Sequence, residues 1–575
     1  MHLPRRLALC PAARRALGTK ARPSVTLKAS SAGLPDFIEH WSRDAFYKVG
    51  AGGVGLTVAC GILAGPFQPA TVGLAVLTAA YWRRGLLDIQ QKEQSIKRNF
   101  PVLGHVRYVL ESLRPEIRQY FVEGDEEAAP FDRLHRATIY QRAKGAPSAL
   151  PFGTRRDVYD EKYEWATHSL FPTELQEQRI VIGATNPACT QPYSSSLLNI
   201  SAMSYGALSE QAILALSTGA EIGDFSHNTG EGGISRFHIE GGGALVWNIG
   251  TGYFGCGTGG MKRSFDADMF SQNVKHASMV EIKLSQGAKP AHGGMLPKSK
   301  ITKEIAEARN LAFPATEDCN SPPRHSAFNT MDELCDFIQK LRTLSDGKPI
   351  GVKMCVGKPS ELARMIYGFQ ATGVHPDFIT IDGGEGGTGA APPEFSNSIG
   401  MPLADALTLT HALLVGAGLR DPLDRSKSRV ALIASGKIST GFAMFKAFAM
   451  GADVCNAARP FLFSLGCIQA LKCHTNKCPT GITTQDPMLS FGLDPTLKAT
   501  RVARFHRETV HACVEVVQAC GLDSVRDVRP NHVMRRIASN SCAPLDVLYP
   551  HLTVRQGELL KSAGPAELQR LWDHR

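Results

Sequence analysis

Three cysteines lie close together in the segment CIQALKCHTNKCPTG, residues 467–481. Five residues separate Cys467 from Cys473, four separate Cys473 from Cys478, and a proline follows the last thiol. A thiolate can act as a metal ligand, whereas a buried thiol can simply fill space as a small apolar group. This spacing recurs nowhere else among the 14 cysteines. Two interpretations compete: the three cysteines are a group of ligands, or they are packing residues.

The composition is that of a large globular protein. Of 575 residues, 43% are hydrophobic and 20% are charged, which is enough to bury a sizeable core and exceeds one ordinary domain. The net charge of +10 is partly N-terminal, and no basic stripe with interleaved aromatic residues follows, so we expect no nucleic-acid binding. The 14 dispersed cysteines are too few for a disulfide scaffold and favour a reducing compartment.

Apolar, strand-like runs alternate with amphipathic helical segments from about residue 151 to 490. Several of these runs end in glycine-rich loops, as in PIGVKMCVG, FITIDGGEGGTGAAP and VALIASGKIS. Strands that alternate with helices form a parallel sheet with right-handed crossovers. The number of repeats predicts an α/β fold, a closed (β/α)8 TIM barrel, over residues 151–490.

The loops at the carboxyl ends of such strands carry the chemistry of a barrel, and the loops after the last two strands often hold phosphate. The segments ASGKISTG and NAARP occupy this place and offer backbone N–H groups to an anion. Glycine-rich loops also form ordinary tight turns, so the composition alone is weak evidence. Its repetition at successive strand ends nevertheless predicts a ligand that carries a phosphate.

Five ordered segments resemble one protein family. They are SAMSYGALSEQA, SHNTGEGG, KLSQGAKPAHGGMLPKSKI, DGGEGGTGAAP and SLGCIQALKCHTNKCPTGITTQDP, spread over residues 190–490. They look like the FMN-binding synthase domain of glutamate synthases, most of all its short, archaeal-type and stand-alone forms. The resemblance implies that Cys467, Cys473 and Cys478 bind a [3Fe-4S] cluster beside the flavin, and three thiolates suit a cluster with one open corner.

The resemblance also places FMN over the mouth of the barrel. Ala202, Met203 and Ser204 of the first-strand loop would border the isoalloxazine ring. Lys353 would lie near the N1 and O2 edge, where a cation stabilises the reduced ring, and a lysine paired with a structural carboxylate is the alternative. The other contacts implied by the family are backbone approaches at Gly383, Gly384, Gly386, Gly387 and Thr388, and phosphate contacts at Gly436, Lys437, Ala458 and Arg459.

By resemblance, the substrate pocket contains Gln286, Lys289 and Arg309. Lysine and arginine suit the two carboxylates of a 2-oxo dicarboxylate, because one offers a point charge and the other a two-pronged contact. Exposed surface positions are the alternative for both. Glu231 in NTGEGG matches an acidic residue near the flavin, and we expect a dry site to raise its pKa so that it can handle a proton.

The implied reaction is the reduction of 2-iminoglutarate, formed from 2-oxoglutarate and ammonia, to L-glutamate. Electrons would enter through the cluster from a ferredoxin or a reductase subunit. No glutamine amidotransferase domain fits before residue 150, so ammonia would be free or come from a glutaminase partner. Arg324 in SPPRHS replaces one of two family histidines, while His325 remains. This departure leaves open another imine or amine substrate, as in an N-methylglutamate synthase-type subunit, and a non-catalytic membrane-tethered scaffold.

The first 150 residues carry separate expectations. Residues 1–35 contain five arginines, two lysines and no acidic residue, which is typical of a mitochondrial targeting peptide, although a disordered basic tail has the same composition. Residues 49–82 are uncharged and are divided by prolines into arms of about 17 and 15 residues. They predict an apolar helical hairpin, attached to a membrane or buried in a soluble fold. The rest of 36–150 would link this hairpin to the barrel, and 491–575 would form a helical cap.

Overall fold

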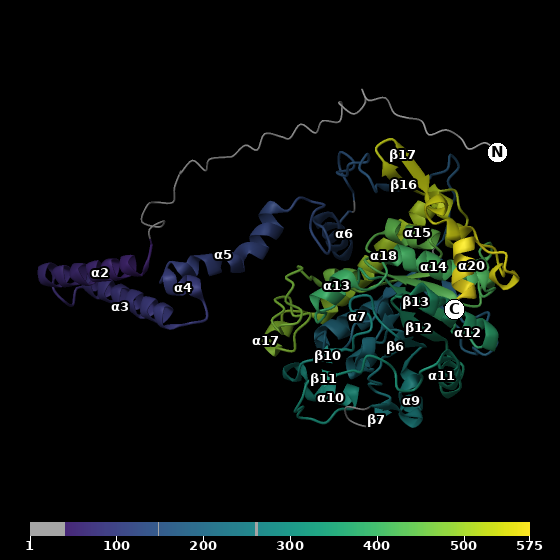
Figure 1. Ribbon diagram of the computed structural model, residues 1–575, viewed down its shortest axis with the longest axis horizontal. Coiled ribbons are helices and arrows are strands. Elements are labelled where there is room, and N and C mark those ends of the chain that lie inside the picture. The colour runs from purple at the N-terminus through teal and green to yellow at the C-terminus, as the bar shows by residue number, and fades with distance from the viewer. Residues whose placement is uncertain (1–40, 148, 177, 259–262) are drawn as a thin grey trace, which may run out of the picture. The chain divides into compact units, whose positions relative to one another are not determined.

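The computed structural model describes residues 41–147, 149–176, 178–258 and 263–575, and the targeting-like segment 1–35 lies outside this range. The chain divides into two compact units, Met1–Glu123 and Gly124–Arg575. The larger unit contains a closed barrel of eight parallel strands (Figure 1). This finding confirms the TIM-barrel fold that the alternating sequence pattern predicts.

The barrel strands are short and almost wholly buried, since one face of each points into the barrel and the other meets the surrounding helices. The ring runs in the order β12, β13, β14, β15, β4, β5, β6, β9. In chain order the strands are β4 Leu198–Ile200, β5 His227–Asn228, β6 Leu245–Ile249, β9 Met279–Lys283, β12 Ile350–Met354, β13 Phe378–Asp382, β14 Ala431–Ser435 and β15 Val454–Ala457.

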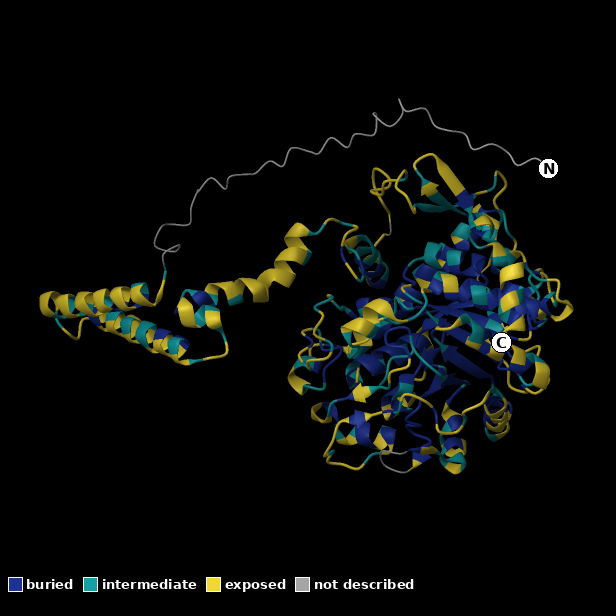
Figure 2. Ribbon diagram, viewed as in Figure 1, coloured by how far each residue is buried: buried dark blue, intermediate teal, exposed yellow. Residues whose placement is uncertain are grey.

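Helices surround the barrel, and their packing against the strands forms a continuous buried core, which is dark blue in Figure 2. Side-chain caps set several helix starts: Ser209 caps α7, Thr330 and Glu333 form a capping box at α11, and Thr440 caps α15. The enclosing helices are α7 Glu210–Ile222, α8 Arg236–Glu240, α9 Ala267–Asn273, α10 Lys303–Arg309, α11 Met331–Leu344, α12 Pro359–Thr372, α13 Pro393–Ser398, α14 Leu403–Gly416, α15 Gly441–Ala449 and α16 Arg459–Leu465.

The ends of the larger unit pack against the barrel helices. The 25-residue helix α18 contacts α6, α7, α15 and α16. Strand β16 pairs with β1, from the start of the unit, and with β17. Residues 491–575 therefore contain strands as well as helices. The elements outside the barrel are α6 Arg133–Lys144, β1 Glu164–Ala166, β2 Ile180–Ile182, β3 Tyr193–Ser195, β7 Gly257–Thr258, β8 Ser264–Phe265, β10 Met295–Leu296, β11 Cys319–Asn320, α17 Pro487–Ser490, α18 Pro495–Ala519, β16 Val533–Ala538, β17 Ser541–Pro544, α19 Leu545–Leu548 and α20 Ala566–Asp573.

The smaller unit is built from helices alone over the residues that are described. Its elements are α2 Arg43–Ala64, α3 Pro69–Gln90, α4 Ser95–Asn99, α5 Gly104–Ile117 and the π-helical turn η2 Arg118–Val122. Helices α2 and α3 form the predicted hairpin. Each has 22 residues and is therefore about 33 Å long, more than the predicted arms, because both helices continue through charged residues at the open end of the hairpin.

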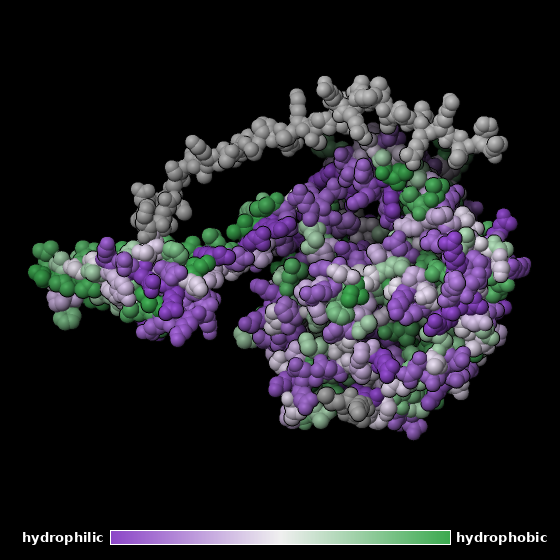
Figure 3. All heavy atoms as spheres, in the orientation of Figure 1, coloured by the Kyte–Doolittle hydropathy of each residue, from purple (hydrophilic) through white to green (hydrophobic). Residues whose placement is uncertain are grey.

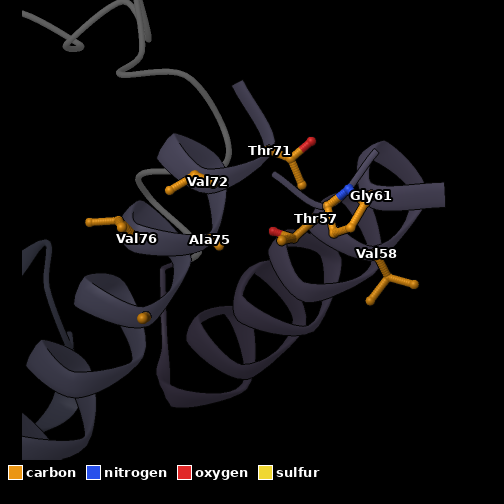
Figure 4. A pocket seen from close by; sticks show the side chains of 9 residues that line it. Thr57, Val58, Gly61, Thr71, Val72, Ala75 and Val76 are labelled. Atoms are coloured by element: carbon orange, nitrogen blue, oxygen red, sulfur yellow. The ribbon is translucent and has the colours of Figure 1, made fainter. Parts of the chain in front are cut away.

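Aromatic side chains hold the open end of the hairpin together. Phe46 is fully buried between Tyr81 and Trp82, and the Trp82 indole donates a 3.1 Å hydrogen bond to the Gly50 carbonyl. Toward the tip, a groove lined by small and apolar side chains separates the two helices (Figure 4). Among the described residues, α2 is the one helix whose length and composition would allow it to cross a membrane.

Candidate active site

Asp382, the last residue of β13, contacts side-chain or backbone groups from three neighbouring segments of the barrel. Its Oδ2 lies 3.5 Å from Lys353 Nζ of β12 and accepts a 2.9 Å hydrogen bond from the Gly287 N–H. Its Oδ1 accepts a 2.8 Å hydrogen bond from the Ser435 hydroxyl, at the end of β14. Sequence reasoning missed Asp382, although its place at a strand end, directly before the glycine-rich loop, was a usable signal.

Lys353 is buried and charged. Burial alone would lower the pKa of a lysine, but the negative charges of Asp382, Glu281 and Glu231 outweigh it and raise the pKa of Lys353. The contact with Asp382 is the carboxylate pairing considered as the alternative role for this lysine. A lysine ammonium carries three protons, so this contact leaves donors for a further acceptor.

Glu281 supplies a buried polar layer one step deeper in the barrel. Its carboxylate accepts hydrogen bonds of 2.7 and 2.6 Å from the side-chain amides of Asn228 and Asn248, and one of 2.7 Å from the Thr380 hydroxyl. All four residues are buried, and they come from four different strands. The network satisfies a carboxylate in a low-dielectric interior and keeps its negative charge close to Lys353.

Glu231 lies in the loop after β5, and its Oε2 is 2.9 Å from Lys283 Nζ at the end of β9. Burial alone would raise the pKa of Glu231, but the charges of Lys283, Arg309 and Lys289 outweigh it and lower the pKa. The expected rise in the pKa of Glu231 is therefore wrong, because the site is dry but rich in cations. An ionised carboxylate can accept a proton or face a cationic substrate group.

The predicted substrate residues surround this carboxylate. Gln286 lines a small pocket together with Glu231 and Lys283. Lys289 is buried. Burial and the charge of Lys283 lower its pKa, and these two effects outweigh the charge of Glu231, which would raise it. Lys283 was not among the residues predicted from the sequence, although it opens the quoted motif KLSQGAKPAHGGMLPKSKI and stands at a strand end, which was a usable signal.

Arg309 ends helix α10 and is buried. Its Nη2 donates a 3.0 Å hydrogen bond to the Tyr205 carbonyl, and its guanidinium lies 4.9 Å from the centre of the Phe254 ring. Its charge still contributes to the low pKa of Glu231. The exposed-surface alternative is therefore wrong for both Arg309 and Lys289.

The loop of Ala202, Met203 and Ser204 follows β4 and is partly exposed. It packs against the loop that carries Glu231. Gly230 makes this packing possible, because a Cβ there would lie 2.5 Å from the Ser204 nitrogen, and its φ of 63° also favours glycine. The first-strand loop and the acidic residue are thereby brought together as predicted.

His325 contributes to this wall as a neutral residue. Its Nδ1 lies 3.0 Å from the Tyr253 hydroxyl, and its Nε2 lies 2.9 Å from the Lys283 carbonyl oxygen. Burial lowers the pKa of His325 to about 4. Its neighbour Arg324 is exposed.

Two cations meet at the ends of β14 and β15. Lys437 is exposed and has a left-handed backbone (φ 51°), while Arg459 is half-buried and begins α16. Burial and the charge of Arg459 lower the pKa of Lys437. In the part of the chain that the structure describes, no carboxylate lies within 4.0 Å of either cationic group. Two neighbouring cations without a carboxylate partner suit a phosphate, which can accept charge-assisted hydrogen bonds from both.

The glycine-rich loop after β13 reaches from these cations to the cysteine segment. A Cβ at Gly387 would lie 2.7 Å from Arg459 Nη1, and one at Gly389 would lie 3.1 Å from the Cys473 Cβ. Gly383, Gly384 and Gly386 are likewise close to other loop atoms, and Gly436 packs near Leu403. Thr388 is exposed, and Ala458 directly precedes α16.

The three predicted ligand cysteines lie close enough to affect one another's ionisation. Burial raises the pKa of Cys467 to about 11 and also raises that of Cys473. For Cys478, hydrogen bonds from Thr480 and Thr483 outweigh burial and lower the pKa to about 7. Among the described residues, no group of three or more acidic, histidine or cysteine side chains converges as ligands of a single metal ion. A polynuclear cluster requires less convergence, because each cysteine binds a different iron.

Two neighbouring segments support the cysteine loop. The Tyr140 hydroxyl of α6 donates a 2.5 Å hydrogen bond to the Cys467 carbonyl. Lys300 is buried, and its ammonium donates to the carbonyls of Cys473 and Thr483 at 3.2 and 3.3 Å. Sequence reasoning missed Lys300, which belongs to a quoted motif but folds back onto a loop more than 170 residues away.

The sequence of residues 155–523 matches the family model described as the conserved region in glutamate synthase. A glutamate synthase large subunit-like protein of Bacillus subtilis is 35% identical over 504 residues, which cover 80% of this chain and 93% of that protein. The chain belongs to the glutamate synthase family. This result confirms the family expected from the ordered motifs and, with it, a glutamate synthase-type oxidoreductase, of the class that acts on CH–NH2 donors.

Two archaeal-type relatives match over a smaller share. The archaeal-type glutamate synthase [NADPH] of Thermotoga maritima is 33% identical over 58% of this chain and 61% of its own length. The archaeal glutamate synthase [NADPH] of Methanocaldococcus jannaschii is 33% identical over 61% of this chain and 64% of its own length. The chain therefore spans less than two thirds of the length of these glutamate synthases.

Proposed function

We propose that this glutamate synthase family member reduces 2-iminoglutarate, formed from 2-oxoglutarate and ammonia, to L-glutamate, with FMN and a [3Fe-4S] cluster as cofactors. One observation carries the proposal. Lys283, Lys289, Lys353 and Arg309 gather around the ionised Glu231 at the carboxyl end of the barrel. Such a concentration of buried positive charge suits a dicarboxylate and a flavin that becomes anionic on reduction.

The residues present fit the two proposed cofactors. Lys437 and Arg459 would hold the FMN phosphate, Lys353 would face the pyrimidine edge of the ring, and the Ala202–Ser204 loop would border it. Cys467, Cys473 and Cys478 would ligate the cluster. When bound, FMN supplies hydride transfer at N5 and the cluster supplies one-electron transfer.

The side chains around Glu231 would bind and orient the substrate. Lys289 and Lys283 offer ammonium donors to carboxylates, and Gln286 offers an amide to a polar group at C2. Because the pKa of Glu231 is lowered, its carboxylate would face the iminium cation and hold it against the flavin side of the pocket. The raised pKa with which the sequence analysis expected Glu231 to handle a proton is no part of this role.

The partners and location remain part of the proposal. Electrons would come from a ferredoxin or a reductase subunit, and ammonia would be free or supplied by a glutaminase. The hairpin of residues 49–82 would attach the protein to a membrane, and residues 1–35 would direct it to the mitochondrion. The exposed Arg324 favours a second candidate, a related imine such as that formed from methylamine and 2-oxoglutarate, as used by an N-methylglutamate synthase-type subunit.

The test is anaerobic purification of the full chain, followed by analysis of FMN, iron and sulfide. The reduced protein is then mixed with 2-oxoglutarate and either ammonium or methylamine, and reoxidation of the flavin is followed by absorbance. Faster reoxidation with ammonium and formation of L-glutamate support the proposal. Faster reoxidation with methylamine selects the second candidate, and protein that lacks both FMN and iron leaves only a non-catalytic scaffold.

A further inference from the structure

Helix α5 presents an apolar stripe that none of the described residues of its own unit, 41–123, covers. Val106, Val109, Leu110, Leu113 and Ile117 occur at helical spacing, and each is 42–56% exposed. The stripe continues into η2, where Tyr120, Phe121 and Val122 are 53–85% exposed. Figure 3 shows hydrophobic surface along one side of this segment. Such a contiguous stripe marks an interaction surface.

Charged residues border the stripe on α5, and the surrounding segment is basic. Residues 83–118 contain eight lysines and arginines against four acidic residues, a net charge of +4. Arg107, Arg114 and Arg118 lie on the helix or directly after it. An apolar stripe bordered by arginines is typical of a helix that lies in the headgroup region of an anionic membrane.

A buried carboxylate fixes the start of α5 to the open end of the hairpin. Asp88 of α3 is 1% exposed, and its Oδ2 accepts a 3.0 Å hydrogen bond from the Val102 N–H. Its Oδ1 lies 2.8 Å from His105 Nε2 and 3.3 Å from Arg84 Nη2. This clamp joins α5 to the end of the hairpin that carries Tyr81, Trp82 and the basic residues.

The two ends of the hairpin differ in chemistry. The tip, around Gly65 and Pro66, is uncharged and carries Leu63 and Phe67, which are 87% and 91% exposed. The open end combines aromatic and basic side chains, the pattern found where a membrane protein meets the headgroups. A hairpin with its tip in the hydrocarbon would therefore hold α5 at the level of the membrane surface.

We propose that α5 and η2 form an in-plane membrane-binding helix, which rests its Val106–Ile117 stripe on an anionic lipid surface at the base of the α2–α3 hairpin. The lipid surface is favoured over a second protein because the stripe, the arginines and the aromatic end of the hairpin all match one flat, negatively charged boundary. The catalytic assignment plays no part in this inference.

The test places a fluorescent label on either face of α5 in the full chain. Leu110→Cys reports the stripe, and Glu111→Cys, one residue further on, is the matched control on the polar face. Both are made in a background in which Cys10, Cys60 and the exposed Cys542 are serine. Each protein is reconstituted into vesicles that contain phosphatidylglycerol, with and without a headgroup-attached quencher.

We expect the quencher to reduce emission from position 110 several-fold more than from position 111. Replacing Arg107, Arg114 and Arg118 with glutamine should weaken the preference for anionic over neutral vesicles by roughly fivefold per arginine. Equal quenching at both positions overturns the proposal. Blue-shifted emission from a label at position 110 that the quencher does not reduce also overturns the proposal, because it shows that protein covers the stripe. A shift that depends on protein concentration indicates another copy of the chain. A shift that does not depend on it indicates the same chain.

Discussion

The substitution Lys437→Met tests the phosphate site with little risk to the fold, because the side chain is exposed and no carboxylate of the described residues lies within 4.0 Å of its ammonium. A charge-assisted hydrogen bond contributes about 1.5–3 kcal/mol. Exposure to solvent screens the interaction and places Lys437 at the lower end of this range, which corresponds to about tenfold weaker binding of FMN. Riboflavin, which has no phosphate, should bind equally well to both proteins.

The assay titrates apoprotein with FMN or riboflavin and follows the quenching of flavin fluorescence. Lys427→Met is the matched control, since Lys427 is an exposed lysine that precedes β14, at the end of the strand away from Lys437, and pairs with Asp424. Loss of the repulsion from Arg459 should leave the apoprotein at least as stable as the parent in thermal unfolding. Equal losses for FMN and riboflavin, or no loss for FMN, would refute the assignment of Lys437 to the phosphate.

Three further perturbations probe the site and the smaller unit. In Lys283→Met, the pKa of Glu231 should rise, because the lysine charge no longer opposes the effect of burial. As the pH is lowered, activity that needs the ionised carboxylate should then be lost at a higher pH than in the parent. Lys283→Arg should restore the parent's pH profile. An unchanged acid limit would contradict this ion pair's role. Lys300→Met should lower the iron content of anaerobically purified protein, because Lys300 binds the cysteine loop. Lys303→Met, which changes a 72% exposed side chain, should not. Equal iron in both variants would argue that Lys300 does not support the cysteine loop. Asp88→Asn should speed proteolysis between α3 and α5, and unchanged cleavage would show that the clamp is dispensable.

The barrel could be predicted because its signal is local and repeated. Parallel strands bring their carboxyl ends to one rim, so residues near strand ends, such as Lys353 and Glu231, gather without any knowledge of side-chain geometry. The same logic brought Lys437 and Arg459 together. The helical hairpin was also predicted from a local pattern, the uncharged residues 49–82. Its two helices extend beyond this range into charged residues on both sides.

The partners of these residues could not be predicted in the same way. Lys283 meets Glu231, and Lys300 meets Cys473, across long stretches of chain whose register is set only when the barrel closes. The direction of the pKa shift of Glu231 depends on the balance between burial and three nearby cations, and only the folded geometry decides that balance. Buried partners such as Glu281 look, in sequence, like any other charged residue in a strand.

The glycine-rich loop that follows β13 has a consequence for engineering. Gly387 lies against Arg459, and Gly389, two residues further on, lies against Cys473. One short piece of backbone therefore lies against both Arg459, a proposed phosphate ligand, and a cysteine of the 467–478 segment. A side chain added at Gly387 would require the Arg459 guanidinium to move, and one added at Gly389 would press on Cys473, so a redesign of this loop bears on both regions.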